Sequence, residues 1–117
     1  MSCYYQNKYS FCDRTSESSK IMKKFPDRLP IICEKNIYSK NAPDIDKKKY
    51  LVPKDLTVGQ FMYTIRKRIN MEPSQALFFF IDGNIPTNSE LLSSCYESYR
   101  NLDGFLYIIY DIENIFG

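Results

Sequence analysis

The strongest secondary-structure signal in this 117-residue chain is a helix that begins just after Thr57. Thr57 and Gln60 have the residue types and spacing of a capping box, in which each side chain bonds the other residue's backbone N–H. Three apolar residues then recur at every fourth position and share one helical face: Phe61, Ile65 and Ile69. A helix with one apolar face must pack against another layer, so the flanking segments are expected to supply a sheet.

Short apolar segments on both sides of this helix have the composition of β-strands. We expect strands over 29–34, 50–53, 77–81 and 105–110. The last of them has no polar residue at a core position, which is typical of a central strand buried on both faces. Asp82 and Gly83 are expected to form a turn after the third strand.

Two further regions are predicted to be helical. Residues 1–25 contain neither glycine nor proline and fit two short helices, and residues 87–99 fit a helix that ends before Gly104. The predicted fold is therefore α+β, a ubiquitin-like β-grasp with a four-stranded mixed sheet and two helices, preceded by two N-terminal helices. This divides the chain into a helical extension (1–25), a β-grasp core (26–111) and a flexible C-terminal tail (112–117).

The chain contains no histidine, and this excludes whole classes of site. A Ser-His-Asp triad, a Cys-His dyad and a histidine-ligated metal all need that side chain. A small hydrolase would have to rely on carboxylates or lysine, and the sequence shows no clustered pair. We therefore expect no catalytic residues and no cofactor.

The four cysteines, at 3, 12, 33 and 95, are irregularly spaced and lack a C-x-x-C pair, so a zinc site is not expected. Cys33 and Cys95 are expected to be small buried core residues, whereas Cys3 and Cys12 are expected to be exposed. The N-terminus lacks the apolar stretch of a secretory signal, which favours reduced thiols and a cytoplasmic protein.

Charge and hydropathy exclude two further classes of protein. Sixteen basic and fourteen acidic side chains leave a net charge of +2, which does not indicate a nucleic-acid partner. The longest apolar runs, 76–81 and 105–110, are far shorter than the ~20 residues of a transmembrane helix. We expect a monomer in solution.

Several long motifs, in the same order along the chain, resemble one protein family. The chain resembles the autophagy-related ubiquitin-like modifiers, and most of all their GABARAP branch. The segments that carry this resemblance are Lys23–Pro30, Asp46–Pro53, Asp55–Phe61, Ile65–Ile69, Ala76–Phe80 and Asp103–Tyr107.

The resemblance implies a protein tag that is joined to phosphatidylethanolamine through its terminal glycine, here Gly117. Family members are activated by an E1-like enzyme, transferred by an E2-like enzyme and released by a deconjugating cysteine protease. On autophagosomal or other cytoplasmic vesicle membranes they support membrane growth and recruit cargo receptors that carry aromatic-x-x-aliphatic motifs. Because nothing follows Gly117, we expect activation without prior cleavage. The alternative is an adaptor that binds such motifs but is never lipidated.

The resemblance also implies a peptide site beside the second strand, where an extended peptide can add to an exposed sheet edge. An aromatic pocket maps to Glu17, Ile21, Pro30, Ile32, Lys49, Leu51 and Phe105. An aliphatic pocket maps to Tyr50, Val52, Pro53, Leu56, Phe61 and Ile65. An electrostatic rim for acidic flanking residues maps to Arg28, Lys47 and Arg68. Taken singly, each residue also fits an ordinary core or surface position.

The chain departs from the GABARAP branch at Thr64, where leucine is usual, and at Cys3, where an aromatic residue is usual.

Overall fold

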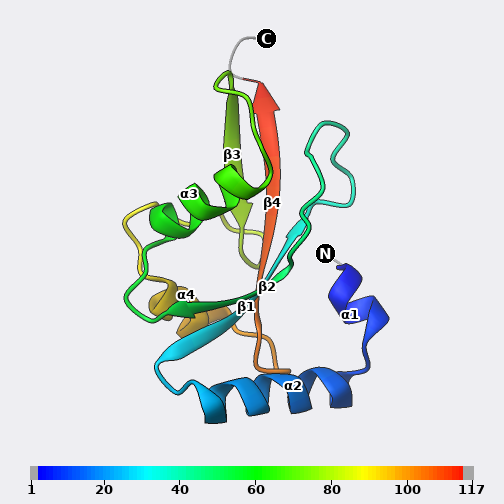
Figure 1. Ribbon diagram of the computed structural model, residues 1–117, viewed down its shortest axis with the longest axis vertical. Coiled ribbons are helices and arrows are strands. Elements are labelled where there is room, and N and C mark those ends of the chain that lie inside the picture. The colour runs from blue at the N-terminus through cyan, green and yellow to red at the C-terminus, as the bar shows by residue number, and fades with distance from the viewer. Residues whose placement is uncertain (1–2, 115–117) are drawn as a thin grey trace.

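The computed structural model describes residues 3–114 and has one four-stranded sheet with helices on both faces (Figure 1). The elements in chain order are α1 (Tyr4–Lys8), α2 (Phe11–Lys24), β1 (Arg28–Lys35), β2 (Lys49–Pro53), α3 (Val58–Arg68), β3 (Gln75–Phe80), α4 (Leu92–Tyr99) and β4 (Leu106–Asn114). The strand order is β2-β1-β4-β3, with β1 and β4 parallel and the outer pairs antiparallel. This confirms the predicted β-grasp sheet and the two helices in front of it.

The predicted capping box at the start of α3 is confirmed. The Gln60 N–H donates to the Thr57 hydroxyl at 3.1 Å, and the Thr57 N–H donates to the Gln60 side-chain oxygen at 2.9 Å. Behind this cap, the buried face of α3 packs on the sheet to form the main core. The cap fixes where the helix begins, and the four-residue spacing then places Phe61 and Ile65 on the one face of the helix that is buried.

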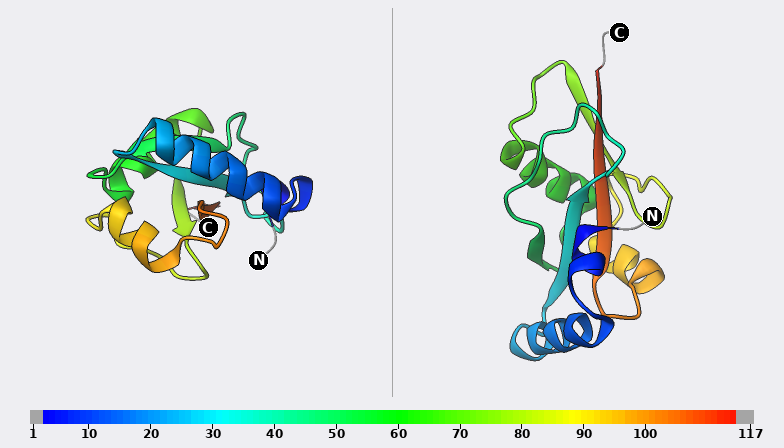
Figure 2. Two further views of the ribbon diagram at one scale, coloured as in Figure 1. Left: turned by 90° about the horizontal axis from the view of Figure 1, so that it is seen from below. Right: turned by 90° about the vertical axis from the view of Figure 1, so that its right-hand side faces the viewer.

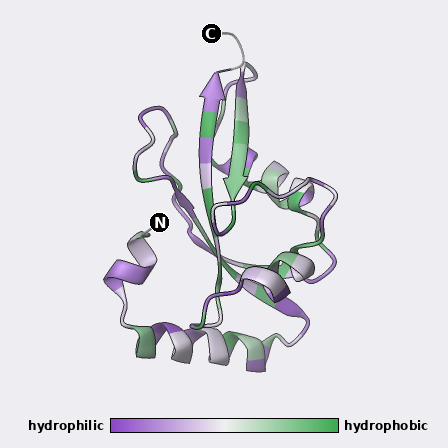
Figure 3. Ribbon diagram, turned by 180° about the vertical axis from the view of Figure 1, so that it is seen from behind, coloured by the Kyte–Doolittle hydropathy of each residue, from purple (hydrophilic) through white to green (hydrophobic). Residues whose placement is uncertain are grey.

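β4 is the central strand that the sequence predicts, and it is longer than expected. It pairs with both β1 and β3, and apolar residues alternate with polar ones toward its C-terminal end (Figure 3). The strand continues to Asn114 because Ile112 is buried in the core and pairs with Leu77 of β3. Residues 112–114, which the sequence placed in a flexible tail, therefore belong to the sheet.

The helix predicted over residues 87–99 begins only at Leu92. Two carbonyls of the preceding segment accept hydrogen bonds from the first turn of α3: Asn88 from the Gly59 N–H and Glu90 from the Val58 N–H, both at 2.9 Å. Carbonyls used in this way satisfy the unpaired donors of another helix and cannot propagate their own. The helix prediction for 87–91 is therefore wrong.

The N-terminal helices lie on the face of the sheet opposite α3 and build a second, smaller core there. α2 crosses one end of the molecule and packs against β1 (Figures 1 and 2). Ile21 of α2 is buried with Ile32 and Phe105, and Tyr5 of α1 packs edge-on against Phe105 with 5.3 Å between ring centroids. Among residues 3–114, no helix is long and apolar enough to span a membrane.

Candidate functional site

β2 is an edge strand, as the expected peptide site requires, and its free main-chain groups can be identified. The Cys33 N–H donates to the Lys48 carbonyl at 2.8 Å, and hydrogen-bonded pairs alternate along an antiparallel ladder. Lys49 and Leu51 therefore direct their N–H and C=O groups away from β1. Pro30 lies opposite Leu51, where its missing N–H removes no bond from this pair of strands.

The side chains of β2 alternate between two environments, one on each face of the sheet. Tyr50 and Val52 are buried against α3, whereas Lys49 and Leu51 point to the side that carries α2 and are more exposed. An extended peptide added at this edge would thus meet one surface on each side of its backbone.

The predicted aromatic-pocket residues lie together between α2 and the sheet. Ile21, Ile32 and Phe105 form one buried cluster, Leu51 packs against it, and Pro30 is buried nearby in β1. These contacts join α2, β1, β2 and the start of β4 into one apolar surface beside the free edge.

An ion pair closes one side of this surface. Lys49 Nζ of β2 lies 2.8 Å from Glu17 Oε1 of α2, and both side chains are about two-fifths exposed. The hydrogen bond from Lys49 is the main cause that lowers the pKa of the Glu17 carboxyl below its usual value. The pair crosses from helix to edge strand, so a bound peptide would meet it directly.

The predicted aliphatic-pocket residues fall into two groups. Tyr50, Val52, Phe61 and Ile65 are buried in the main core, where the Tyr50 and Phe61 rings meet edge to face with centroids 5.4 Å apart. Only Leu56 and Pro53 of the set are half-buried or exposed. The four buried residues lie beneath the surface between β2 and α3. A ligand bound there would therefore contact Leu56 and Pro53.

The predicted rim residues surround β2 and already have partners within the chain. Arg28 Nη1 donates to the outward-facing Leu51 carbonyl at 3.3 Å. Lys47 Nζ lies 5.0 Å from the centroid of the Tyr50 ring. Arg68 Nε pairs with Asp46 at 3.1 Å in an exposed contact. A strand added at this edge would replace the Arg28 contact with a main-chain bond.

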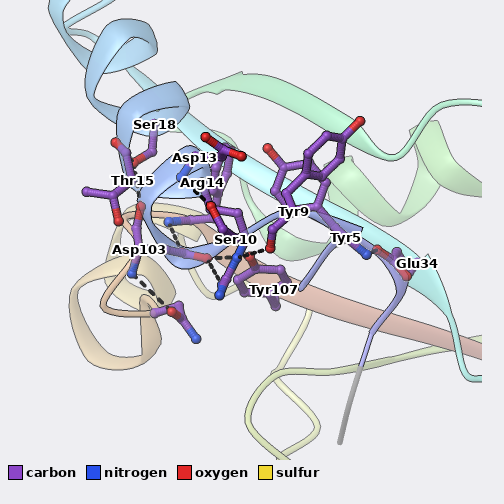
Figure 4. Close-up of polar contacts among 12 residues, drawn as sticks. Tyr5, Tyr9, Ser10, Asp13, Arg14, Thr15, Ser18, Glu34, Asp103 and Tyr107 are labelled. Atoms are coloured by element: carbon purple, nitrogen blue, oxygen red, sulfur yellow. Dashed lines mark hydrogen bonds and ion pairs between the residues drawn. The ribbon is translucent and has the colours of Figure 1, made fainter. Parts of the chain in front are cut away.

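A polar network that sequence reasoning missed attaches α2 to the body of the protein (Figure 4). Arg14 Nη1 of α2 lies 2.6 Å from Asp103 Oδ2, whose side chain is fully buried. Tyr107 also donates to this carboxylate, and the Ser18 hydroxyl donates to the Asp103 carbonyl. Arg14 and Asp103 are 89 positions apart, and no local pattern in the sequence links them.

A second missed contact holds α1. The buried Glu34 carboxylate of β1 accepts hydrogen bonds from the N–H groups of Tyr4 and Tyr5, each at 2.8 Å (Figure 4). A carboxylate at this position satisfies donors that the first turn of a helix leaves unpaired. Neither end of this contact has a sequence signature, because the partners are about 30 residues apart.

The cysteines are placed partly as expected. Cys33 and Cys95 are buried, which confirms their prediction, and Cys12 is exposed. The expected exposure of Cys3 is wrong, because this residue is the N-cap of α1 and is 2% exposed. Burial raises the pKa of the Cys3 thiol to about 11 and that of Cys95 to about 11.

In residues 3–114, no group of three His, Cys, Asp or Glu side chains is arranged to hold a metal. Gly117, the predicted conjugation residue, lies outside the described residues.

Comparison with known proteins gives a consistent result over the whole chain. The family model described as autophagy protein Atg8, ubiquitin-like, matches residues 13–117. Autophagy-related protein 8 of Schizosaccharomyces pombe is 51% identical over 117 residues, covering 100% of this chain and 96% of that protein. Autophagy-related protein 8 of Mycosarcoma maydis is 51% identical over 113 residues, with coverage of 97% and 95%.

Solved structures agree with this result. The crystal structure of Trypanosoma brucei ATG8 has a TM-score of 0.91 and 40% identity, and the match covers 100% of both chains. A structure of Plasmodium falciparum Atg8 in complex with a Plasmodium falciparum Atg3 peptide has a TM-score of 0.84 and 31% identity, covering 94% of this chain and 96% of that one.

Proposed function

Because the chain belongs to the Atg8 family of autophagy-related ubiquitin-like proteins, we propose that it works as a conjugated modifier and a peptide-binding adaptor. It is not an enzyme, and it is joined to phosphatidylethanolamine in autophagy. The observation that carries this function is the identity of about one half along the entire chain to curated family members.

We propose Gly117 as the conjugated residue. ATP converts its carboxylate to an acyl adenylate and releases pyrophosphate, and the E1-like thiol then displaces AMP to form a thioester. The E2-like thiol displaces the E1-like thiol, and the phosphatidylethanolamine amine displaces the E2-like thiol to form the amide. A residue without a side chain allows close approach to the narrow active sites of these enzymes. The lipid contributes two acyl chains, which is what stable anchoring to a membrane requires.

The free edge of β2 is proposed to receive the aromatic-x-x-aliphatic segments of cargo receptors and adaptors. The outward main-chain groups of Lys49 and Leu51 would pair with the peptide backbone. The apolar cluster beside α2 would take the aromatic side chain, and the surface between β2 and α3 would take the aliphatic one. Basic groups at Arg28, Lys47 and Arg68 would favour peptides with acidic flanks, chiefly by speeding their association.

The conjugation enzymes are proposed partners, together with a deconjugating cysteine protease. A relative that is 31% identical to this chain was solved with a peptide of Atg3, which is an E2-like enzyme. This supports an E2-like enzyme as one of the proteins that engage this fold. We propose that the conjugated form resides on autophagosomal or other cytoplasmic vesicle membranes.

Within the family, the motif resemblance supports placement near the GABARAP branch. The curated relatives described above are fungal autophagy-related proteins 8. Placement in the GABARAP branch is therefore a proposal finer than membership of the family.

Reconstitution tests the function. The protein is incubated with ATP, the E1-like and E2-like enzymes, and vesicles that contain phosphatidylethanolamine, with Gly117→Ala as the matched control. We expect a vesicle-bound product of higher mass from the wild type alone. A wild-type protein that stays unconjugated while an established family member is conjugated in the same mixture would favour the non-lipidated adaptor.

A further inference from the structure

The loop between β1 and β2 presents two neighbouring apolar side chains to solvent. Ile37 is 51% exposed and Tyr38 is 77% exposed, and Lys40 nearby is also exposed. A single exposed apolar residue is normal on a protein surface, whereas adjacent exposed apolar residues form a small patch of the kind that marks interaction sites. The charges around them are mixed, because Lys35 at the base of the loop is paired with Asp44 at 2.8 Å.

The loop is held firmly to the rest of the molecule. Asp111 of β4 accepts a hydrogen bond from the Asn36 amide at 3.1 Å and one from the Ser39 hydroxyl at 2.7 Å. The Tyr38 N–H donates to the Asn36 side chain at 3.1 Å. Further along the loop, Tyr110 of β4 donates its hydroxyl proton to the carbonyl of Pro43. The exposed pair is thus displayed on a fixed support.

The supporting residues Tyr110 and Asp111 lie in the middle third of β4, and the strand continues from them toward the proposed conjugation site. The loop lies at the same end of the long axis as the C-terminal end of β4, and α2 lies at the opposite end (Figures 1 and 2). Gly117 follows Asn114 by three positions in the sequence, and three residue steps span at most about 11 Å. A lipid on Gly117 would therefore bring the bilayer surface close to this end of the protein.

We propose that, in the conjugated protein, Ile37 and Tyr38 insert into the headgroup region of the membrane that carries the lipid anchor. This inference rests on the proposed function. A tyrosine ring suits the interface because its body is apolar and its hydroxyl can remain hydrated. The Lys40 stem can extend along the same surface with its ammonium group among lipid phosphates. The contact would fix the orientation of the modifier and leave the β2 edge free for peptides.

The absence of tryptophan allows a direct test. Tyr38→Trp places one fluorophore in the loop, and Leu102→Trp places one at a residue that is 92% exposed and belongs to the segment between α4 and β4. That segment lies at the end of the molecule occupied by α2 (Figure 1). Both variants are conjugated to phosphatidylethanolamine vesicles with and without brominated acyl chains. We expect a blue shift and bromine quenching for the Tyr38→Trp protein, and neither change for Leu102→Trp.

Emission from the Tyr38→Trp conjugate that stays water-like would overturn the inference. A blue shift without bromine quenching would also overturn it, because it would indicate burial against protein. If neither variant is conjugated by the enzymes, the proposed function fails separately. In that case each variant, carrying also Gly117→Cys and Cys12→Ser, is coupled to maleimide-bearing phosphatidylethanolamine vesicles, and the same fluorescence readout decides the inference.

Discussion

Arg14 and Asp103 form an ion pair that joins α2 to the segment leading into β4, with 2.6 Å between Nη1 and Oδ2. Only 12% of the Arg14 side chain is exposed, and none of the Asp103 side chain is. α2 also supplies Glu17 and Ile21 to the proposed aromatic pocket. The position of α2, and with it of Glu17 and Ile21 in the pocket, therefore depends on an ion pair that lies outside the pocket.

Removing one partner of this pair should destabilise the protein strongly. We expect Asp103→Ala to lower the free energy of unfolding by about 3 kcal/mol, because it leaves the mostly buried Arg14 charge without its partner. Asp27→Ala, which removes a carboxylate from an exposed turn, is the matched control. Urea denaturation measures both. A loss below about 1 kcal/mol for Asp103→Ala would match a surface ion pair and contradict the account.

The N-terminal cap of α3 should be worth a measurable share of stability. Thr57→Ala removes the hydroxyl that accepts from the Gln60 N–H and should cost about 1 kcal/mol. Thr64 lies on the same helix, is exposed, and donates its hydroxyl proton to the Gln60 carbonyl at 3.3 Å. Thr64→Ala should be neutral or slightly stabilising, since alanine has the higher helix propensity. Equal effects of the two variants in thermal denaturation would show that the capping hydrogen bond makes no measurable contribution to stability.

The Glu17–Lys49 pair should appear in the titration of Glu17. Its carboxyl pKa is lowered chiefly by the hydrogen bond from Lys49, so Lys49→Gln should raise it toward the usual value. The pair stabilises the fold above the unfolded pKa of glutamate, and this contribution is lost as pH falls through the lowered folded value. NMR titration of the Glu17 side chain measures the shift, and an unchanged pKa in Lys49→Gln would exclude the pair in solution.

Leu51 is the best single residue with which to test the peptide site. Tyr50 is unsuitable, because it is buried and its ring packs on Phe61. Leu51→Ala should weaken binding of an aromatic-x-x-Leu peptide roughly tenfold, which corresponds to about 1.4 kcal/mol. Leu102→Ala removes an almost fully exposed leucine that is not among the proposed pocket residues, and it should change nothing. Calorimetry that gives the two variants equal affinity would remove Leu51 from the site.

Local signals predicted the elements of this fold well where neighbours in sequence are also neighbours in space. The capping box at Thr57, the turn at Gly83 and the apolar run of the central strand are such cases. The helix expected from residue 87 failed because tertiary hydrogen bonds to α3 took the carbonyls of that segment. The end of β4 was misplaced because the burial of Ile112 depends on β3, which is remote in sequence.

For the candidate site, the family resemblance identified residues that the fold does place around one edge strand. The resemblance could not indicate which of these residues are exposed enough to contact a bound peptide. Phe61 and Ile65 are completely buried, and their spacing fits a core face equally well. The Arg14–Asp103 and Glu34–Tyr4 contacts were missed because each joins segments that meet only after folding.

The most direct test of the central claim is the mass spectrum of the product recovered from conjugation vesicles. The account predicts an increase in mass equal to phosphatidylethanolamine less one water, carried by the C-terminal peptide as an amide on Gly117. Phospholipase D, which cleaves the headgroup from the lipid, should leave only ethanolamine attached. An unmodified C-terminal peptide, or lipid found on another residue, would contradict the account.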